Sequence, residues 1–210
     1  MKDQKSHWNN AHKEQWLRSH SSTQTKYAEE VNAVIKSNSK ILELGCGEGN
    51  DSIYFATQGH SVVATDFSDI VISQNSEKYT HSNLDFMELD ISQPFRFEDE
   101  TFDVVYARLS LHYFTNEQTS SIFREIRRVL KNGGTLHFMC KSVDDSIYGK
   151  GAMIEADMYE LDGHIRHFFS KDYVRKLLLD NGYGNIEIVS GVEKIYERIS
   201  AFIKASASKA

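Results

Sequence analysis

The chain has 210 residues, of which 40% are hydrophobic, 26% charged and 11% aromatic. This length and composition are typical of one globular domain with a sizeable core. The formal net charge of −6 makes nucleic acid an unlikely partner and favours a small-molecule substrate, because no overall positive field exists.

The cysteine content and the hydrophobicity pattern exclude further classes of protein. The two cysteines, Cys46 and Cys140, are too few and too far apart for a disulfide framework or a metal knuckle, so no metal site is expected. No apolar run approaches ~18 residues, the length that a transmembrane helix needs. Residues 1–10 are polar and do not resemble a signal peptide. A cytoplasmic protein without a membrane segment is therefore expected.

Residues 1–25 form a polar arm that carries two large aromatic side chains, Trp8 and Trp16. Low hydrophobicity predicts a disordered or loosely attached segment, whereas tryptophan rings favour burial. Two interpretations stay open: the rings anchor the arm to the domain, or the arm folds over an active site as a lid.

Residues 26–205 alternate between strand and helix patterns, which requires parallel strands joined by right-handed crossovers. The last two strands are separated by too few residues for a crossover and must pair antiparallel. We therefore predict one α/β domain with a doubly wound, mostly parallel sheet of seven strands that ends in an antiparallel hairpin. Periodicity predicts helices over 26–36, 51–58, 70–79, 116–130 and 170–180. It predicts strands over 41–44, 61–65, 84–89, 102–107, 135–140, 185–192 and 197–204. Residues 205–210 are expected to be a frayed tail.

Residues 142–169 interrupt this alternation. Their periodicity is weak, and they contain several polar and aromatic side chains. A long connection without regular structure in a compact domain is usually functional. We therefore predict that this insertion is a second lid.

A glycine-rich turn follows the first predicted strand, with Gly45, Gly47 and Gly49 at alternate positions before a helix. Such a turn brings bare backbone and a helix N-terminus close to a ligand. Glu43 lies just before the turn, where a carboxylate would repel a phosphate but would suit a cationic group. S-adenosylmethionine carries two such groups, an ammonium and a sulfonium. The dinucleotide fingerprint requires a third glycine where Asn50 stands.

Two further acids follow predicted strands. Asp66 comes a little under twenty residues after Gly49, which is close to the spacing at which an acid binds a ribose in nucleotide-binding folds. The alternative is that Asp66 caps the next helix. Asp90 follows the third predicted strand in the same way.

Five segments together resemble the class I S-adenosylmethionine-dependent methyltransferases of the small-molecule type, in the order and spacing that this family shows. They are Leu42-Glu43-Leu44-Gly45-Cys46-Gly47-Glu48-Gly49, Asp66-Phe67-Ser68, Leu89-Asp90-Ile91, Phe102-Asp103-Val104-Val105 and Leu130-Lys131-Asn132-Gly133-Gly134.

The resemblance implies a Rossmann-like methyltransferase fold and a role for each matching residue. The three glycines and Glu43 would approach the methionyl part of the donor, and Asp66 would accept from both ribose hydroxyls. Asp90 would accept from the adenine amino group. Phe67 would pack on the adenine, the Ile91 backbone N–H would contact it, and Ala107 and Arg108 would meet the methionyl amine and the acceptor.

The acceptor side is less defined. Ala107-Arg108-Leu109-Ser110 stands where the DNA amine methyltransferases of this class carry Asp/Asn-Pro-Pro-Tyr/Phe, which speaks against DNA bases. His112 is the candidate general base if the acceptor must lose a proton, and the alternative is a surface or packing histidine. The candidates for the substrate wall are Tyr148, His164, Arg166 and His167, with an acidic substrate favoured if Arg166 points inward.

We therefore predict methyl transfer from S-adenosylmethionine to a small molecule by in-line displacement. Two alternatives stay open. One is a non-catalytic module that binds the donor or scaffolds a partner, against which Glu43, Asp66 and Asp90 argue. The other is a nicotinamide-linked oxidoreductase, which Glu43 and Asn50 disfavour.

Overall fold

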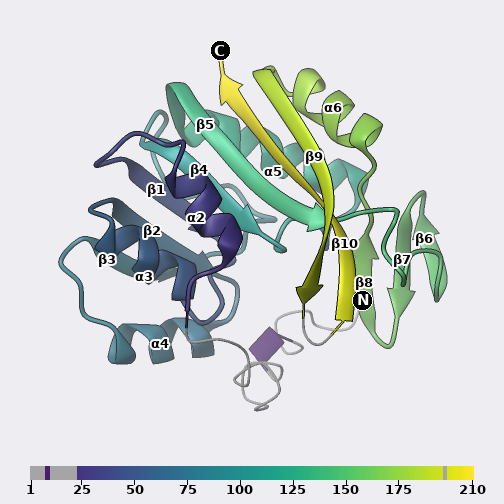
Figure 1. The fold of residues 1–210 in the computed structure, drawn as a ribbon, viewed down its shortest axis with the longest axis horizontal. Helices are drawn as coiled ribbons and strands as arrows, with labels where there is room; N and C mark the ends of the chain where they lie inside the picture. The colour runs from purple at the N-terminus through teal and green to yellow at the C-terminus, as the bar shows by residue number, and fades with distance from the viewer. Residues whose placement is uncertain (1–7, 10–22, 196–197) are drawn as a thin grey trace. The chain divides into compact units, whose positions relative to one another are not determined.

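The computed structural model describes residues 8–9, 23–195 and 198–210 (Figure 1). These residues divide into two compact units. The first unit comprises the described residues up to Ile91 together with Phe102–Tyr106, and the second comprises Ser92–Thr101 and Ala107–Ala210.

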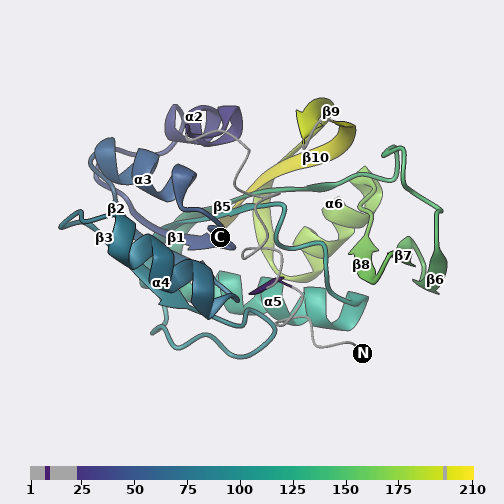
Figure 2. The same cartoon turned by 90° about the horizontal axis from the view of Figure 1, so that it is seen from below.

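The first unit is built on parallel strands. Strand β1 pairs with β2 on one side and with β4 on the other, and β2 pairs with β3. Strands β1 and β4 are nearly continuous apolar runs, as expected for parallel strands that are buried on both faces. Helices α2 and α3 lie side by side (Figures 1 and 2). The elements are α2 (Lys26–Asn32), β1 (Lys40–Leu44), α3 (Asn50–Thr57), β2 (Ser61–Asp66), α4 (Asp69–Lys78), β3 (Leu84–Glu88) and β4 (Phe102–Arg108), whose last two residues belong to the second unit.

The second unit combines antiparallel strands with two helices. Helix α5 (Asn116–Val129) begins at a capping box formed by Thr115 and Gln118, and β5 (Leu130–Lys141) follows it directly. Strand β10 (Arg198–Lys209) pairs antiparallel with both β5 and β9 (Tyr183–Ile195). Helix α6 (Lys171–Asp180) lies along β9 (Figure 1).

The strands of the main sheet follow the order β3-β2-β1-β4-β5-β10-β9. Strands β1 to β4 pair in parallel, and β9 and β10 form the antiparallel hairpin. The predicted fold class, a seven-stranded α/β sheet with a C-terminal antiparallel hairpin, is confirmed.

Two local predictions are wrong. Residues 205–209 belong to β10 instead of a frayed tail, because Ala205 and Ala207 are buried opposite Phe138 and Leu136 of β5. Alternating Ala and Ser in this segment is a period-2 strand pattern whose inward side chains are small. The predicted lack of regular structure in residues 142–169 is also wrong.

Residues 152–167 form a separate small antiparallel sheet of three strands (Figure 1, right). The strands are β6 (Ala152–Glu155), β7 (Met158–Leu161) and β8 (His164–His167). Asp162 and Gly163 join the last two with φ values of 54° and 79°, which is the geometry of a two-residue hairpin with both central residues left-handed. This Asp-Gly pair was the sequence signal for the hairpin.

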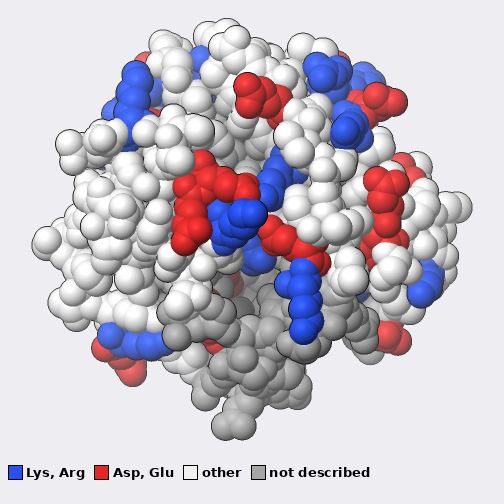
Figure 3. All heavy atoms as spheres, viewed as in Figure 1, with Lys and Arg blue, Asp and Glu red and all other residues white. Residues whose placement is uncertain are grey.

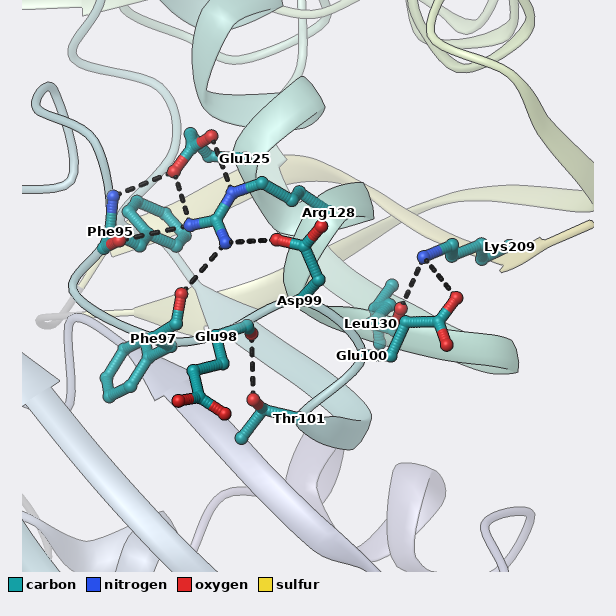
Figure 4. Close-up of polar contacts among 10 residues, drawn as sticks. All are labelled: Phe95, Phe97, Glu98, Asp99, Glu100, Thr101, Glu125, Arg128, Leu130 and Lys209. Carbon is teal, nitrogen blue, oxygen red and sulfur yellow. Dashed lines mark hydrogen bonds and ion pairs between the residues drawn. The ribbon is translucent and has the colours of Figure 1, made fainter.

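Arg128 near the end of α5 fixes the loop before β4 (Figure 4). Its Nε and Nη2 donate to the two carboxylate oxygens of Glu125 at 3.0 and 2.8 Å, and its Nη1 donates to Asp99 Oδ1 at 2.7 Å. The same guanidinium donates to the carbonyl oxygens of Phe95 and Phe97 at 3.0 and 2.8 Å. A planar guanidinium can satisfy all these acceptors at once, which lysine cannot.

Replacing Arg128 by alanine is expected to lower the free energy of unfolding by about 2–3 kcal/mol, because it leaves a half-buried carboxylate and two carbonyls without their donor. Arg128 holds the pKa of Glu125 below its ordinary value of 4.5. The stabilisation is therefore complete above that value and is lost as pH falls through the lower, folded-state pKa. Urea unfolding of wild type, Arg128→Ala and the control Arg124→Ala at pH 7 and pH 3 measures both effects. If the difference in the free energy of unfolding between wild type and Arg128→Ala is the same at both pH values, the role of Glu125 is contradicted.

Candidate functional site

The glycine turn after β1 is held against β2 by its backbone. Both Gly45 N and Cys46 N donate to Thr65 O at 2.8 Å. A Cβ atom on Gly47, whose φ is 50°, would meet no atom within 4 Å, so the turn exposes its backbone to open space there. Gly49 differs, since a Cβ on it would meet the Phe86 ring at 3.0 Å. Gly47 thus leaves room for a ligand, whereas Gly49 allows close packing at the start of α3.

Asp66 at the end of β2 links the glycine turn to the segment that precedes α4. Its Oδ2 accepts from Gly47 N at 3.0 Å, and its Oδ1 accepts from Ser68 N at 2.9 Å. Each carboxylate oxygen keeps the capacity to accept another hydrogen bond. The alternative role as a helix cap is excluded, because the N-cap of α4 is Ser68, whose Oγ accepts from Val71 N.

Glu43 gives the turn a second carboxylate. It is 3% exposed, and its Oε2 accepts from Ser52 Oγ in the first turn of α3. The pKa of the Cys46 thiol is raised well above its ordinary value, first by burial and then by the negative charges of Asp66 and Glu43. These acids therefore create a negative potential at the turn, which suits a cationic ligand group and opposes a phosphate.

A third acid, Asp51, was not selected from the sequence. It is buried and accepts from Thr25 N at 2.7 Å, from Thr25 Oγ1 at 2.9 Å and from Tyr106 Oη at 2.7 Å. Burial, then Asp51 and Glu43, raise the pKa of Tyr106. The only sequence signal was an acid in the first turn of a helix, which is too common to be informative.

The remaining donor-side candidates lie at the ends of β2 and β3. Phe67, Asp90 and Ile91 are half-buried, and Leu89 N donates to Asp66 O at 2.9 Å, which brings the two strand ends together. Asn75 of α4, another residue that sequence reasoning missed, donates through Nδ2 to Gly47 O at 2.7 Å. It positions the turn from a neighbouring helix.

Of the predicted arm, residues 8–9 and 23–25 are described, and Asn9 contacts the residues that follow Asp66. Ser68 Oγ donates to Asn9 Oδ1 at 2.7 Å, and Asn9 Nδ2 donates to Asp69 Oδ1 at 3.0 Å. Trp8 is half-buried, whereas Trp16 lies outside the described residues.

The second unit contains the candidates for the acceptor side. Ala107 is buried, and Arg108 is half-buried with its Nη2 at 3.9 Å from Glu193 Oε2. His112 is 1% exposed and its ring lies 4.4 Å from that of Tyr113, so it is not a surface histidine. Burial, followed by the positive charges of Lys141, Arg166 and His167, lowers its pKa well below 6.5. Its imidazole is therefore neutral at pH 7.

The four residues expected in the substrate wall do not share one face. Tyr148 is 37% exposed and donates to Asp157 Oδ1 at 2.6 Å. His164 and Arg166 alternate with His167 along β8, so His167 points to the opposite face of that strand. His167 is 1% exposed, whereas His164 and Arg166 are half-buried.

A cleft of about 890 Å³ in the second unit contains none of these candidates. Arg128 and Lys209 contribute to its lining, and both are engaged: Lys209 Nζ donates to Leu130 O at 2.8 Å and pairs with Glu100 at 3.4 Å (Figure 4). We interpret this part of the cleft as space between structural ion pairs.

The chain is similar to known methyltransferases over part of its length. A family model described as a methyltransferase domain matches residues 41–134. Phosphoethanolamine N-methyltransferase 1 of Triticum aestivum is 34% identical over 110 residues, which are 50% of this chain and 22% of that protein. The chain spans between 20% and 47% of the length of the first curated relatives that it matches.

Solved structures share the fold. A methyltransferase of Methanosarcina mazei, described as SAM-dependent, superposes with a TM-score of 0.74 at 20% identity, covering 89% of this chain and 98% of that one. Phosphoethanolamine N-methyltransferase 2 of Haemonchus contortus, in complex with S-adenosyl-L-methionine, gives a TM-score of 0.67 at 15% identity over 87% of this chain and 51% of that one.

Proposed function

We propose that the chain is an S-adenosylmethionine-dependent methyltransferase that transfers a methyl group to a small-molecule acceptor, as its similarity to the methyltransferase domain over residues 41–134 supports. The observation that carries the proposal is the acidic glycine turn. Glu43 and Asp66 both act on Cys46 within that turn, and Gly47 presents open backbone. This arrangement fits a ligand with a ribose and a cationic aminoacyl end better than it fits a dinucleotide phosphate.

When it is bound, S-adenosylmethionine supplies an electrophilic methyl group on a sulfonium. Asp66 would hold the ribose hydroxyls, and Glu43 with the Gly45–Gly49 backbone would orient the aminoacyl end. Phe67, Asp90 and Ile91 would hold the adenine. Positioning of the reactants can supply about 7–11 kcal/mol of the barrier reduction in favourable cases. Where the acceptor must lose a proton, neutral His112 would take it.

Surface charge supports a small acceptor. On the face shown in Figure 3, basic and acidic side chains are interspersed, and no broad basic surface covers it. The relatives named for phosphoethanolamine are consistent with a small polar acceptor.

The cytoplasm is the compartment that we propose. Cys46 and Cys140 are free, buried thiols, which a reducing compartment preserves. Among the residues that the structure describes, no helix has the length and hydrophobicity needed to cross a membrane.

Isothermal titration with S-adenosylmethionine, S-adenosylhomocysteine, NAD and NADP separates the alternatives for the ligand. We expect the first two to bind and the nicotinamide nucleotides not to. Transfer of an isotope-labelled methyl group to extracted cell metabolites then tests catalysis. Donor binding without transfer to any metabolite would support the non-catalytic module, and nicotinamide binding would support the oxidoreductase.

Replacing Asn9 by alanine is expected to weaken donor binding about three- to tenfold, as loss of two modest hydrogen bonds would if the arm covers the donor. Calorimetry measures this effect, and donor-dependent tryptophan fluorescence reports movement of the arm. The control Asn116→Ala removes an exposed asparagine contact in the second unit. If Asn9→Ala binds the donor as wild type does, the arm is a passive attachment.

A further inference from the structure

The cleft of about 890 Å³ lies entirely within the second unit, and the ends of α5, α6 and β10 contribute to its lining. The acids that line it all have a cationic partner inside the protein. These ion pairs are Arg128–Asp99 at 2.7 Å, Lys209–Glu100 at 3.4 Å and Lys176–Asp180 at 2.6 Å, of which Figure 4 shows the first two. Each lining acid is therefore already balanced by a positive charge.

Two further cations line the same cleft, Arg124 and Arg127 of α5. They are three positions apart, so they lie on one face of the helix, where like charges repel each other. Neither arginine has the carboxylate of an Asp or Glu side chain within 4.0 Å among the residues that the structure describes. The cleft thus presents a pair of guanidinium groups that no acidic side chain balances.

Both arginines are held in place but keep donors to spare. Arg127 Nε donates to Gly182 O at 3.0 Å, and its Nη2 donates to Ala210 O at 3.4 Å. A Cβ atom on Gly182, whose φ is 75°, would lie 3.1 Å from Arg127 Nε, so the glycine leaves room for this contact. Arg124 Nη2 donates to Ser121 Oγ at 2.8 Å. Because a guanidinium has five N–H groups, both arginines retain donors for a ligand.

The end of the helix does not by itself account for the pair. Cations are favoured in the last turn of a helix, which explains Arg127 and Arg128. Arg124 precedes that turn, and the effect of the helix dipole falls off beyond it. Arg124 nevertheless lines the cleft together with Arg127, in spite of their repulsion.

The lining indicates which anion the cleft suits. A carboxylate has two oxygens in one plane, which a single guanidinium satisfies, whereas a phosphate has a third oxygen for a second guanidinium. Among the described residues that line the cleft, none is aromatic, so a nucleobase would find no ring on which to stack. The lining acids oppose a second phosphate, but their oxygens can still accept from hydroxyl groups.

We infer that this cleft is a second ligand site, and that it binds a phosphate monoester of a small hydroxylated molecule, such as a sugar phosphate. Arg124 and Arg127 would hold the phosphate through charge-assisted hydrogen bonds, and Glu100 and Asp180 would accept from the hydroxyl groups. Because Arg127 also contacts the turn after α6 at Gly182, the ligand would strengthen the connection between α5 and that turn. Its binding should therefore raise the Tm of the protein.

Isothermal titration of glucose 6-phosphate into the full chain tests this site. We expect saturable binding, and we expect it to be tighter than that of three probes at matched ionic strength. Glucose lacks the phosphate, gluconate replaces it by a carboxylate, and pyrophosphate adds a second phosphate and lacks hydroxyl groups. Tighter binding of any of these three would contradict the ligand class that we infer.

Arg124→Gln is the variant that tests the arginine pair, because Arg124 contacts only Ser121 through the hydrogen bond described above. Its Tm without ligand should equal that of wild type, and its Kd for glucose 6-phosphate should rise roughly ten- to hundredfold, the range for loss of a charge-assisted hydrogen bond. The control Arg175→Gln, which changes an exposed arginine of α6, should bind like wild type. Glucose 6-phosphate that does not bind saturably, or that binds Arg124→Gln as tightly as wild type, would overturn the inference. Titration of S-adenosylmethionine into the same samples tests the proposed function separately, since none of the donor-side candidates lines the cleft.

Discussion

Replacing Asp66 by alanine should weaken S-adenosylmethionine binding roughly 30- to 1000-fold, or about 2–4 kcal/mol, because two charge-assisted hydrogen bonds to the ribose are lost. Asp66 also accepts from Gly47 N and Ser68 N, so the variant should in addition loosen the turn that presents the donor site. The protein should remain folded, with an unfolding free energy lower by about 1–3 kcal/mol.

Calorimetry on matched variants separates these two contributions. Asp66→Asn keeps one side-chain oxygen as an acceptor and should bind the donor with intermediate affinity. Asp85→Ala removes an exposed acid from β3 and should leave affinity unchanged. Wild-type affinity in a folded Asp66→Ala protein would remove Asp66 from the site.

Replacing His112 by alanine should lower the rate of methyl transfer by roughly 10²- to 10⁴-fold if the acceptor must lose a proton, which is the usual contribution of a general base. The pKa of His112 lies well below 6.5 because the ring is buried and faces the positive charges of Lys141, Arg166 and His167. The basic form therefore persists to lower pH than for an ordinary histidine, and the rate should stay constant as pH falls through 6.5.

The same lowered pKa affects stability, with a defined sign. Below the ordinary value of 6.5 the unfolded chain takes up a proton that buried His112 does not, so the folded state loses stability as pH falls. Rates of wild type and His112→Ala should therefore be compared above that pH. The control is His81→Ala, which changes an exposed histidine. An unchanged rate and pH profile in His112→Ala would make His112 structural and leave catalysis to positioning alone.

Local patterns in the sequence were sufficient for the fold class and for the main donor-side candidates. Strand-turn-helix periodicity located the glycine turn, and the acids after the strands located Asp66 and Asp90, since the carboxyl ends of parallel strands meet at one edge of a sheet. The Asp162-Gly163 hairpin and the Ala-Ser alternation of β10 were also local signals. They were missed because short strands in polar segments lack the long apolar runs that identify buried strands.

Contacts between distant residues required the tertiary structure. Asn75 donates to Gly47 O, which lies 28 residues earlier in the sequence, and Asp51 accepts from Tyr106, which lies 55 residues later. Neither contact leaves a periodic pattern in the sequence around Asn75 or Asp51. His112, His167 and Tyr173, which carry buried polar atoms without a hydrogen-bond partner, come from a loop, a strand end and a helix start, each of which is ordinary on its own. The sequence by itself determined the order of strands and helices in the main sheet and the residues at the glycine turn, because these follow from local hydrophobic periodicity and turn chemistry. Only the tertiary structure decided which polar atoms are buried and which lack partners, because burial and hydrogen bonding depend on neighbours that the chain supplies from far away.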